Sequence, residues 1–310
     1  MKIAFFGTSQ IGLPILTRLT QEHEVVCVIT SPDAKIGRKQ IFTPSPISLL
    51  ATQLSIPQLK PQTIKKNPEI QEQLQNLNAD IFVVVSYGKI IPEQIINIPK
   101  YKTLNVHFSL LPKYRGASPV QYALLNGEST TGTTIFVLDK GMDTGPILSQ
   151  AQLQINPDET NPELQQRLSI LSTDLLLTTL QKYCSGELLP TDQDNDQATS
   201  TKLISKEDGL IDWGQSADQI YNQFRALQPW PGIYTVWNNK TLKLLKIELV
   251  NANTNSLPPG QVDPQDPTVI HCGNQHSAIR LVEVQLEGKT AIKIKDFING
   301  YPQFKEAKLK

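Results

Sequence analysis

Residues 105–107 read N-V-H and place an amide and an imidazole two positions apart, at the end of an apolar segment. In a β-strand such side chains share one face, so Asn105 and His107 would point the same way. A lone histidine here is more often a structural residue, because imidazole finds hydrogen-bond partners easily. The neighbouring amide and the S-L-L-P-x-x-R-G loop that follows favour a functional site instead.

Asp143 is a candidate carboxylate for the same site, and it lies in a G-M-D-T-G turn. The ordinary interpretation is a surface turn, since Asp and Gly are common in turns. The functional interpretation is that the next βα connection brings Asp143 to the same sheet edge as His107. There it would orient the imidazole and favour its protonated form. Together these residues would offer an amide donor, a titratable base with a carboxylate to orient it, and a loop able to receive a flat ligand, and that combination is more specific than any one of them.

The elements that must position these groups alternate along the first 140 residues. The segment A-D-I-F-V-V-V-S-Y-G is apolar throughout, as expected for a parallel strand covered by helices on both faces. We therefore predict an α/β domain with a Rossmann-like, doubly wound, mostly parallel sheet. Ligands of such sheets bind at the carboxyl ends of the strands, where residues 103–107 end. The expected strands are 2–7, 24–31, 79–88, 103–107 and 133–139, and the expected helices are 11–23, 46–55, 67–77 and 119–127.

The second half of the chain differs in hydrophobic pattern and in composition. Residues 161–186 carry apolar positions at helical spacing and end near a glycine, and residues 189–201 are polar and acidic. Beyond residue 202, short alternating strands separated by Pro, Gly and Asn indicate a small β-barrel or sandwich, and we expect an OB-like β-barrel. We predict a catalytic domain at 1–188, a linker at 189–204 and a C-terminal β-barrel domain at 205–310.

Composition narrows the function classes. The 29 basic and 29 acidic side chains cancel, which excludes a uniformly basic surface but allows a local basic patch. Three cysteines without a C-x-x-C pair indicate neither a zinc site nor a disulfide framework and fit the cytoplasm. No stretch is apolar enough for a membrane span. The run G-T-S-Q-I-G has Ser9 where a dinucleotide fingerprint needs its middle glycine, so Gly7 and Gly12 are expected to be packing glycines.

The N-x-H-x-S-L-L-P-x-x-R-G run, followed by G-M-D-T-G, resembles the formyltransferases that use 10-formyltetrahydrofolate. The resemblance covers nearly the whole chain, and its later motifs select the members of that family that act on tRNA. The supporting stretches are FFGT (5–8), SPDAKIGRKQIFTPSPISLLA (31–51), VVVSYGKIIP (83–92), SKEDGLIDW (205–213), FRALQPWPG (224–232) and DFINGY (296–301).

The resemblance implies transfer of a formyl group from 10-formyltetrahydrofolate to the α-amino group of initiator methionyl-tRNA, for translation initiation. It implies a cytoplasmic enzyme, expected to be a monomer, that needs no metal. Asn105, His107 and Asp143 would be the catalytic residues. The folate site would comprise Ser109, Leu110, Leu111 and Pro112, with Val85, Ser86, Tyr87 and Gly88 at the pterin end. The tRNA contacts would come from Lys35, Arg38, Lys39, Lys243, Lys246, Lys293 and Lys295.

Two alternatives stay open at this point. The N-terminal motifs also fit a formyltransferase that acts on an amino-sugar nucleotide, although the C-terminal half argues against it. A non-catalytic RNA-binding module on a Rossmann-like scaffold is the other alternative, and such a module would not need Asn105, His107 and Asp143 together.

Overall fold

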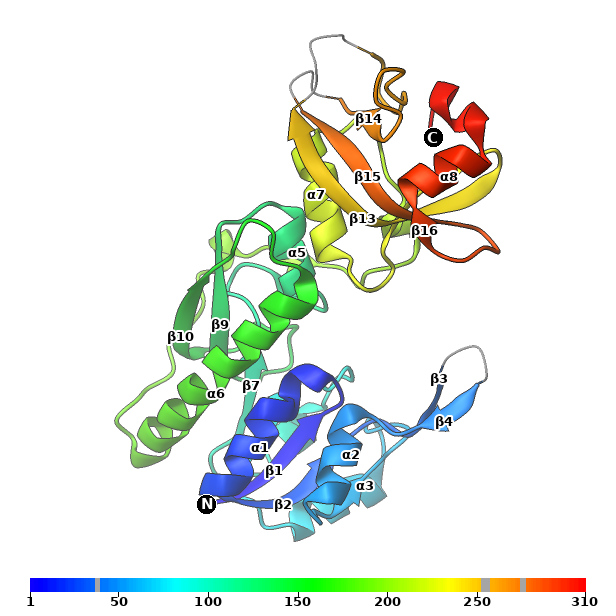
Figure 1. Ribbon diagram of the computed structural model, residues 1–310. Helices are drawn as coiled ribbons and strands as arrows, with labels where there is room; N and C mark the ends of the chain where they lie inside the picture. The colour runs from blue at the N-terminus through cyan, green and yellow to red at the C-terminus, as the bar shows by residue number, and fades with distance from the viewer. Residues whose placement is uncertain (37–39, 252–256, 274–276) are drawn as a thin grey trace. The chain divides into compact units, whose positions relative to one another are not determined.

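The computed structural model describes residues 1–36, 40–251, 257–273 and 277–310 (Figure 1). The chain forms two compact units. Within the described ranges, no helix is both long enough and apolar enough to cross a membrane. Unit 1 comprises Met1–Pro119, Thr130–Ile155 and Leu164–Lys202, and unit 2 comprises Val120–Ser129, Asn156–Glu163 and Leu203–Lys310.

Unit 1 contains a seven-stranded sheet in the order β10-β9-β7-β6-β1-β2-β5. The five strands from β5 to β7 are parallel, whereas β9 is antiparallel to β7 and β10 is antiparallel to β9. The predicted doubly wound, mostly parallel sheet is therefore confirmed. The strands are β1 (Lys2–Gly7), β2 (Glu24–Ile29), β5 (Gln58–Leu59), β6 (Ile81–Val85), β7 (Thr103–His107), β9 (Thr130–Val137) and β10 (Ile147–Gln154).

Helices cover both faces of this sheet, which explains why its central strands are apolar throughout. Alternate residues of β1, β2 and β6 pack in one core cluster with α3 (Pro68–Asn76) and α4 (Glu93–Ile96). The intervening residues of these strands are equally buried. Helices α1 (Leu13–Glu22) and α2 (Pro46–Gln53) pack against β2, and α1 lies in front of β1 in Figure 1.

Local signals set where these helices begin. Ser45 accepts a hydrogen bond from the N–H of Ser48, and Pro46 occupies the first turn of α2, where its missing N–H has no helical partner. Gly7 is a packing glycine, as expected, because a Cβ there would lie 2.6 Å from the Phe5 ring. The remaining elements outside the barrel are α5 (Pro119–Leu125), α6 (Asn161–Ser185), β3 (Ala34–Ile36), β4 (Ile41–Thr43), β8 (Arg115–Gly116), β11 (Ser200–Thr201), η1 (Gln10–Gly12) and η2 (Asn195–Gln197).

Unit 2 contains an antiparallel sheet in the order β12-β13-β15-β14, and β16 pairs with β15. Backbone hydrogen bonds close it into a barrel. Residues 260–262 bond to β14 on one side and to residues 307–309 on the other, and Lys310 bonds to Val236 of β12. The predicted C-terminal β-barrel is thus present. Its elements are β12 (Ile233–Trp237), β13 (Lys240–Asn251), β14 (Val269–His271), β15 (Ser277–Leu286), β16 (Ile292–Lys293), α7 (Ala217–Ala226), α8 (Ile294–Gly300), η3 (Glu207–Gly209) and η4 (Pro302–Glu306).

The barrel core includes an aromatic cluster around Trp237, whose ring centroid lies 5.4 Å from Phe297 and 5.5 Å from both Tyr301 and Phe304. Edge-to-face contacts of this kind add to the stabilisation that burial gives. The boundaries predicted at residues 188 and 205 stay predictions.

Candidate active site

Two of the predicted catalytic side chains meet in unit 1. Nδ1 of His107 lies 3.5 Å from Oδ2 of Asp143, and the two side chains are only 6% and 13% exposed. The other ring nitrogen, Nε2, is 2.9 Å from the carbonyl oxygen of Tyr114. A carbonyl can only accept, so Nε2 carries a hydrogen. In a neutral ring the lone pair is then on Nδ1, directly beside the carboxylate.

Asp143 reaches this place by a route that the sequence did not predict. A parallel strand followed by a helix was expected to bring it to the sheet edge, and that expectation is wrong. β9 runs antiparallel to β7, and Asp143 stands in the connection between β9 and β10. Asp139 closes this turn by accepting hydrogen bonds from the Gly141 N–H (3.0 Å) and the Thr144 hydroxyl (2.8 Å).

The backbone of Asp143 is itself constrained. Its φ of 55° lies in the left-handed region, which is uncommon for residues other than glycine and concentrates at functional sites. Its Oδ2 accepts a hydrogen bond of 2.7 Å from the N–H of Gly116. This hydrogen bond ties the carboxyl group of Asp143 to the loop that carries Gly116.

Asn105 precedes His107 by two residues in β7, so both side chains stand on the same face of the strand. Asn105 is half-buried, and no hydrogen bond between described residues uses its carboxamide. A half-buried amide without a protein partner is available to donate to a bound molecule.

The loop after β7 is anchored by hydrogen bonds to Thr134 of β9. The Thr134 hydroxyl donates to the Ser109 carbonyl (2.7 Å) and accepts from the Leu111 N–H (3.1 Å). Ser109 and Leu111 are buried, and the Ser109 hydroxyl donates to the Lys113 carbonyl. These two predicted folate residues thus shape the loop, whereas Leu110 and Pro112 are half-buried. The Leu111–Pro112 peptide bond is cis.

The predicted pterin segment follows β6. Val85 ends the strand and is buried, while Ser86 and Gly88 are exposed at positive φ. Tyr87 packs edge-on against Phe6, and burial raises the pKa of its phenol to about 12. Within the described residues the Tyr87 hydroxyl has no hydrogen-bond partner.

Just beyond this segment, the backbone N–H groups of Lys89, Ile90 and Ile91 are unused by any hydrogen bond among the described residues. The Lys89 ammonium donates to the carbonyls of Pro61 (2.7 Å) and Gln62 (3.0 Å). Loop backbone with free donors at the carboxyl end of a parallel strand suits a flat ligand with acceptor atoms.

Residues 193–201, which belong to the predicted 189–204 linker, lie within unit 1 and contact the loops that carry Asp143 and Arg115. Gln193 donates to the carbonyls of Asp143 and Gly145, and β11 pairs in parallel with β8. Sequence reasoning missed these contacts because a polar, acidic run carries no pattern that reports a hydrogen-bonding role.

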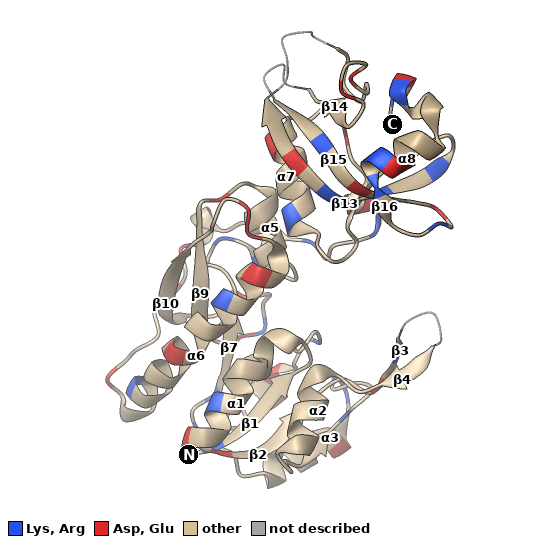
Figure 2. Ribbon diagram, in the orientation of Figure 1, with Lys and Arg blue, Asp and Glu red and all other residues tan. Residues whose placement is uncertain are grey.

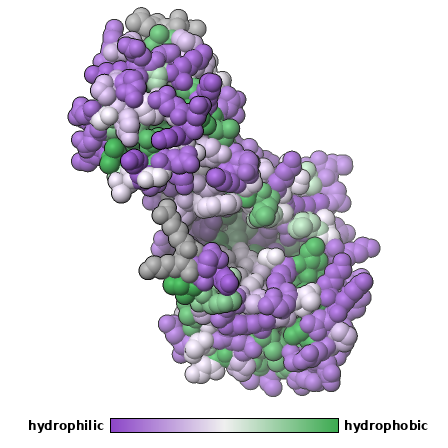
Figure 3. Space-filling model, turned by 90° about the vertical axis from the view of Figure 1, so that its right-hand side faces the viewer, coloured by the Kyte–Doolittle hydropathy of each residue, from purple (hydrophilic) through white to green (hydrophobic). Residues whose placement is uncertain are grey.

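Of the three tRNA-contacting residues predicted in the 31–46 region, Lys35 lies on β3, which pairs with β4 in an antiparallel hairpin. The Lys35 ammonium lies 5.5 Å from the ring centre of Phe42, which is 66% exposed. Arg38 and Lys39 lie outside the described residues. On the face shown in Figure 3, hydrophilic residues predominate and hydrophobic residues lie in separate spots.

The predicted lysines of unit 2 are exposed, and three of them share one face of the barrel sheet. Lys246 pairs across strands with Glu283, which pairs on its other side with Lys293, and Lys243 pairs with Gln285. Directly paired residues project to the same face of a sheet. Lys295 follows on α8, and Figure 2 shows blue and red residues mixed over these elements.

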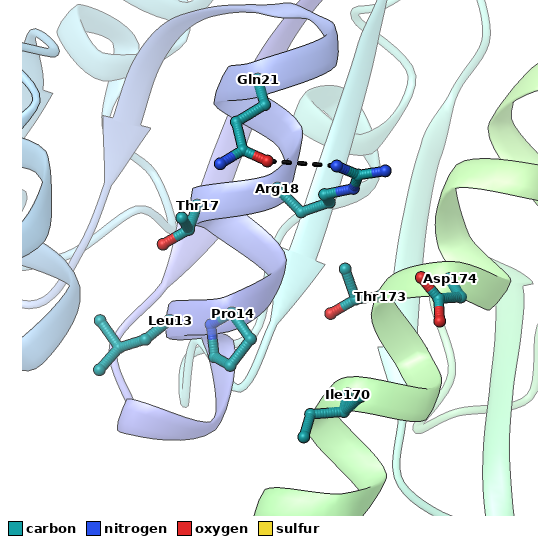
Figure 4. A pocket seen from close by; sticks show the side chains of 8 residues that line it. All are labelled: Leu13, Pro14, Thr17, Arg18, Gln21, Ile170, Thr173 and Asp174. Atoms are coloured by element: carbon teal, nitrogen blue, oxygen red, sulfur yellow. Dashed lines mark hydrogen bonds between the residues drawn. The ribbon is translucent and has the colours of Figure 1, made fainter.

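A hollow of about 480 Å³ opens between α1 and α6, away from the loops described above (Figure 4). Its lining is mainly apolar, and Arg18 at its rim bonds to Gln21 and Glu22 of its own helix. None of the predicted catalytic or folate residues lines it. The described residues also contain no group of three or more His, Cys, Asp or Glu side chains suited to hold a metal ion.

The sequence matches two family models, Formyl transferase over residues 1–180 and Formyl transferase, C-terminal domain over residues 203–302. A methionyl-tRNA formyltransferase of Caldanaerobacter subterraneus subsp. tengcongensis is 40% identical over 97% of both chains. The enzyme of that name from Geobacter metallireducens is 39% identical over 97% of this chain and 96% of its own. The chain belongs to the methionyl-tRNA formyltransferase family.

Solved structures share the fold of this formyltransferase at lower identity. The N-formyltransferase from Helicobacter canadensis, solved with folinic acid and dTDP-3-aminofucose, gives a TM-score of 0.67 at 22% identity, covering 91% of this chain and 99% of its own. HypX from Aquifex aeolicus, in complex with tetrahydrofolic acid, gives 0.63 at 14% identity, covering 98% of this chain and 47% of its own. At these identities the likeness concerns the fold.

Proposed function

We propose that this protein transfers the formyl group of 10-formyltetrahydrofolate to the α-amino group of initiator methionyl-tRNA. The observation that carries the proposal is the full-length likeness, at about 40% identity, to enzymes of that name. The geometry at the end of β7 supports it, because an amide, an imidazole and a carboxylate suit acyl transfer to an amine.

The residues around β6 and β7 fit a reduced folate. The free N–H groups of Lys89, Ile90 and Ile91 can donate to the heteroatoms of a pterin ring, which Val85, Ser86, Tyr87 and Gly88 would border. Leu110 and Pro112 would add apolar contacts near the end that carries the formyl group. When bound, the folate supplies an activated one-carbon acyl group on a nitrogen leaving group.

Each of the three side chains would have a separate role in formyl transfer. Asn105 donates a hydrogen bond to the formyl oxygen as that oxygen gains negative charge, a contribution worth about 3–4 kcal/mol in comparable sites. The lone pair on Nδ1 of His107 accepts the proton that the attacking amine loses, directly or through one water. The carboxylate of Asp143, 3.5 Å away, stabilises the resulting imidazolium. The same imidazolium can return the proton to the departing folate nitrogen.

We propose that the exposed lysines of unit 2 contact tRNA phosphates. Lys243, Lys246 and Lys293 share one sheet face and Lys295 follows on α8, so their charges act on a common surface. Lys35, Arg38 and Lys39 would contact the acceptor stem. Glu283 lies between two of the lysines and limits the local charge, which keeps the predicted electrostatic contribution modest.

We also propose that the protein acts as a monomer in the cytoplasm. Its three cysteines are free, and burial raises the pKa of the Cys27 thiol to about 11 and that of Cys272 to about 12. Thiols that are unpaired and stay protonated fit a reducing compartment. Light scattering of the purified chain, with and without tRNA, measures the oligomeric state.

The direct test is formylation by the purified full chain with 10-formyltetrahydrofolate and charged initiator methionyl-tRNA, followed as formyl-methionyl-tRNA. Elongator methionyl-tRNA and a dTDP-linked amino sugar are offered in parallel. Preference for initiator tRNA is the expected result. Faster formylation of the amino sugar would favour the sugar-nucleotide alternative, and tRNA binding without formyl transfer would favour the RNA-binding module.

A further inference from the structure

The buried side chain of Gln193 joins two loops of the proposed active site. Its Nε2 donates to the carbonyl oxygens of Asp143 and Gly145, each at 2.8 Å. Its Oε1 accepts from Nε (3.0 Å) and Nη2 (2.7 Å) of Arg115. Two donors and two acceptor positions are what a carboxamide has, so its orientation is fixed completely.

A second contact of the same segment reaches the histidine side of the site. Thr199 Oγ1 accepts a hydrogen bond of 2.8 Å from the N–H of Tyr114, and the Thr199 carbonyl accepts one of 2.9 Å from the Arg115 N–H. Tyr114 has a φ of 62°, so this residue needs support from its surroundings. Its carbonyl is the group that accepts the hydrogen of His107 Nε2.

We propose that Gln193 and Thr199 are positioning residues that set the distance and orientation between Asp143 and His107. The inference rests on the proposed function, because it assigns these residues a role in formyl transfer. Gln193 fixes the carboxylate loop through the backbone of Asp143, and Thr199 fixes the imidazole through Tyr114. Neither side chain contacts the reacting groups themselves.

The location of the contacts supports positioning rather than general scaffolding. Asp143 and Tyr114 both stand at positive φ, and each is held by one of the two proposed residues. The Gly116 N–H, which donates to the Asp143 carboxylate, lies in β8, where Gly116 pairs with Thr201 of the same segment. A misplacement of about 1 Å at such groups is enough to reduce turnover by about 100-fold.

Gln193→Glu tests the carboxylate side. The variant keeps the length of the side chain and its acceptor for Arg115, but a carboxylate oxygen then faces two carbonyl oxygens. We expect kcat to fall by roughly 10–100-fold, with KM for folate and tRNA changed by less than about threefold. Gln197→Glu is the matched control, since Gln197 is exposed in the same segment and bonds to Asp194. It should leave kcat unchanged.

A second comparison separates positioning from a structural role. In an Asp143→Asn background, Gln193→Glu should lower single-turnover rates by less than about twofold, because residues that act through one group are not additive. A full additional loss in that background would overturn the inference. So would a Gln193→Glu variant with the kcat of the wild type.

Thr199→Val provides the test if Gln193→Glu does not fold. Thr199 is exposed, so the variant should keep the wild-type unfolding temperature while losing the acceptor for the Tyr114 N–H. We expect kcat to fall by roughly 3–10-fold with KM unchanged, and an unchanged kcat would overturn the inference. A wild-type chain that formylates no methionyl-tRNA would instead overturn the proposed function and this inference with it.

Discussion

Nδ1 of His107 lies 3.5 Å from Oδ2 of Asp143, while Nε2 of the same ring is 2.9 Å from the Tyr114 carbonyl. The carbonyl assigns the hydrogen to Nε2, which leaves Nδ1 as the basic atom and puts a carboxylate beside it. A base with a nearby counter-ion, almost entirely out of water, is the arrangement expected for proton transfer in an acyl-transfer site.

Loss of either member of this pair should reduce turnover without unfolding the protein. We expect His107→Ala and Asp143→Asn each to lower kcat by about 100- to 10,000-fold, since the first removes the proposed proton acceptor and the second removes the charge proposed to stabilise its protonated form. Single-turnover formylation with excess enzyme measures the loss, and exposed Asp192→Asn is the control. A decrease below tenfold for either variant would remove that residue from the mechanism.

Asn105 should act as a donor rather than as a packing residue. Asn105→Asp preserves shape but removes the N–H groups, so we expect kcat to fall by about 100- to 1,000-fold, as when an oxyanion donor is removed. Asn105→Ala should give a similar loss. Asn76→Asp, at an exposed site, controls for the added charge. Wild-type kcat in Asn105→Asp, measured by steady-state formylation, would contradict the assignment.

Gly116 lies where residues 193–201 approach the loop after β7 closely. Its φ is 108°, and a Cβ there would lie 2.7 Å from the Thr201 carbonyl oxygen. Gly186 also has positive φ (82°), but a Cβ there meets nothing within 4 Å. Gly186→Ala should therefore lose only about 1–2 kcal/mol of unfolding free energy from backbone strain. Gly116→Ala should lose more.

The same pair of variants separates stability from function. Gly116→Ala should also lower kcat, because the Gly116 N–H donates to Asp143, whereas Gly186→Ala should keep the wild-type kcat. Urea unfolding and formylation rates measure the two effects. Equal losses of stability in both variants would argue against the close contact with Thr201.

The barrel should lose stability in acid through Asp263. Burial alone raises the pKa of this carboxyl, but hydrogen bonds from the Gln265 and Asp266 N–H groups and from His271 outweigh it, so the pKa lies below 3.8. A group with a depressed folded-state pKa stabilises above its unfolded pKa, and that stabilisation disappears as pH falls through the folded value. We therefore expect the advantage of wild type over Asp263→Asn to shrink below about pH 4.

Tryptophan fluorescence reports the unfolding of unit 2, because all three tryptophans lie beyond residue 203. Unfolding temperatures of wild type and Asp263→Asn are compared from pH 3 to 6, with Asp192→Asn as the control. A difference that stays constant over this range would show that the Asp263 carboxylate does not contribute.

The exposed lysine face of the barrel predicts salt-dependent tRNA binding. Lys246→Gln and Lys293→Gln should each weaken binding and reduce the slope of log K against log salt by about 0.7–0.9, if each neutralises one phosphate. Lys65→Gln, at an exposed site in unit 1, is the control. Filter binding over a range of salt concentrations measures the slopes, and unchanged slopes would place the tRNA elsewhere.

The doubly wound sheet could be predicted from the amino-acid pattern, because apolar strands alternate with helices and continuous hydrophobicity requires cover on both faces. The family could be predicted as well, since N-x-H and G-M-D-T-G occur with motifs along the whole chain. The placement of Asn105 and His107 on one face of β7 followed from the two-residue period of a strand.

The route by which Asp143 reaches His107 could not be predicted from that pattern. Strand direction depends on pairing between distant segments, and β9 turned out antiparallel to β7. The contacts of residues 193–201 could not be predicted either. Gln193 and Thr199 bond largely to backbone atoms, which are the same in every residue and leave no mark on the sequence of their partners. Contacts with the main chain depend on where the chain passes, and a one-dimensional pattern does not record that.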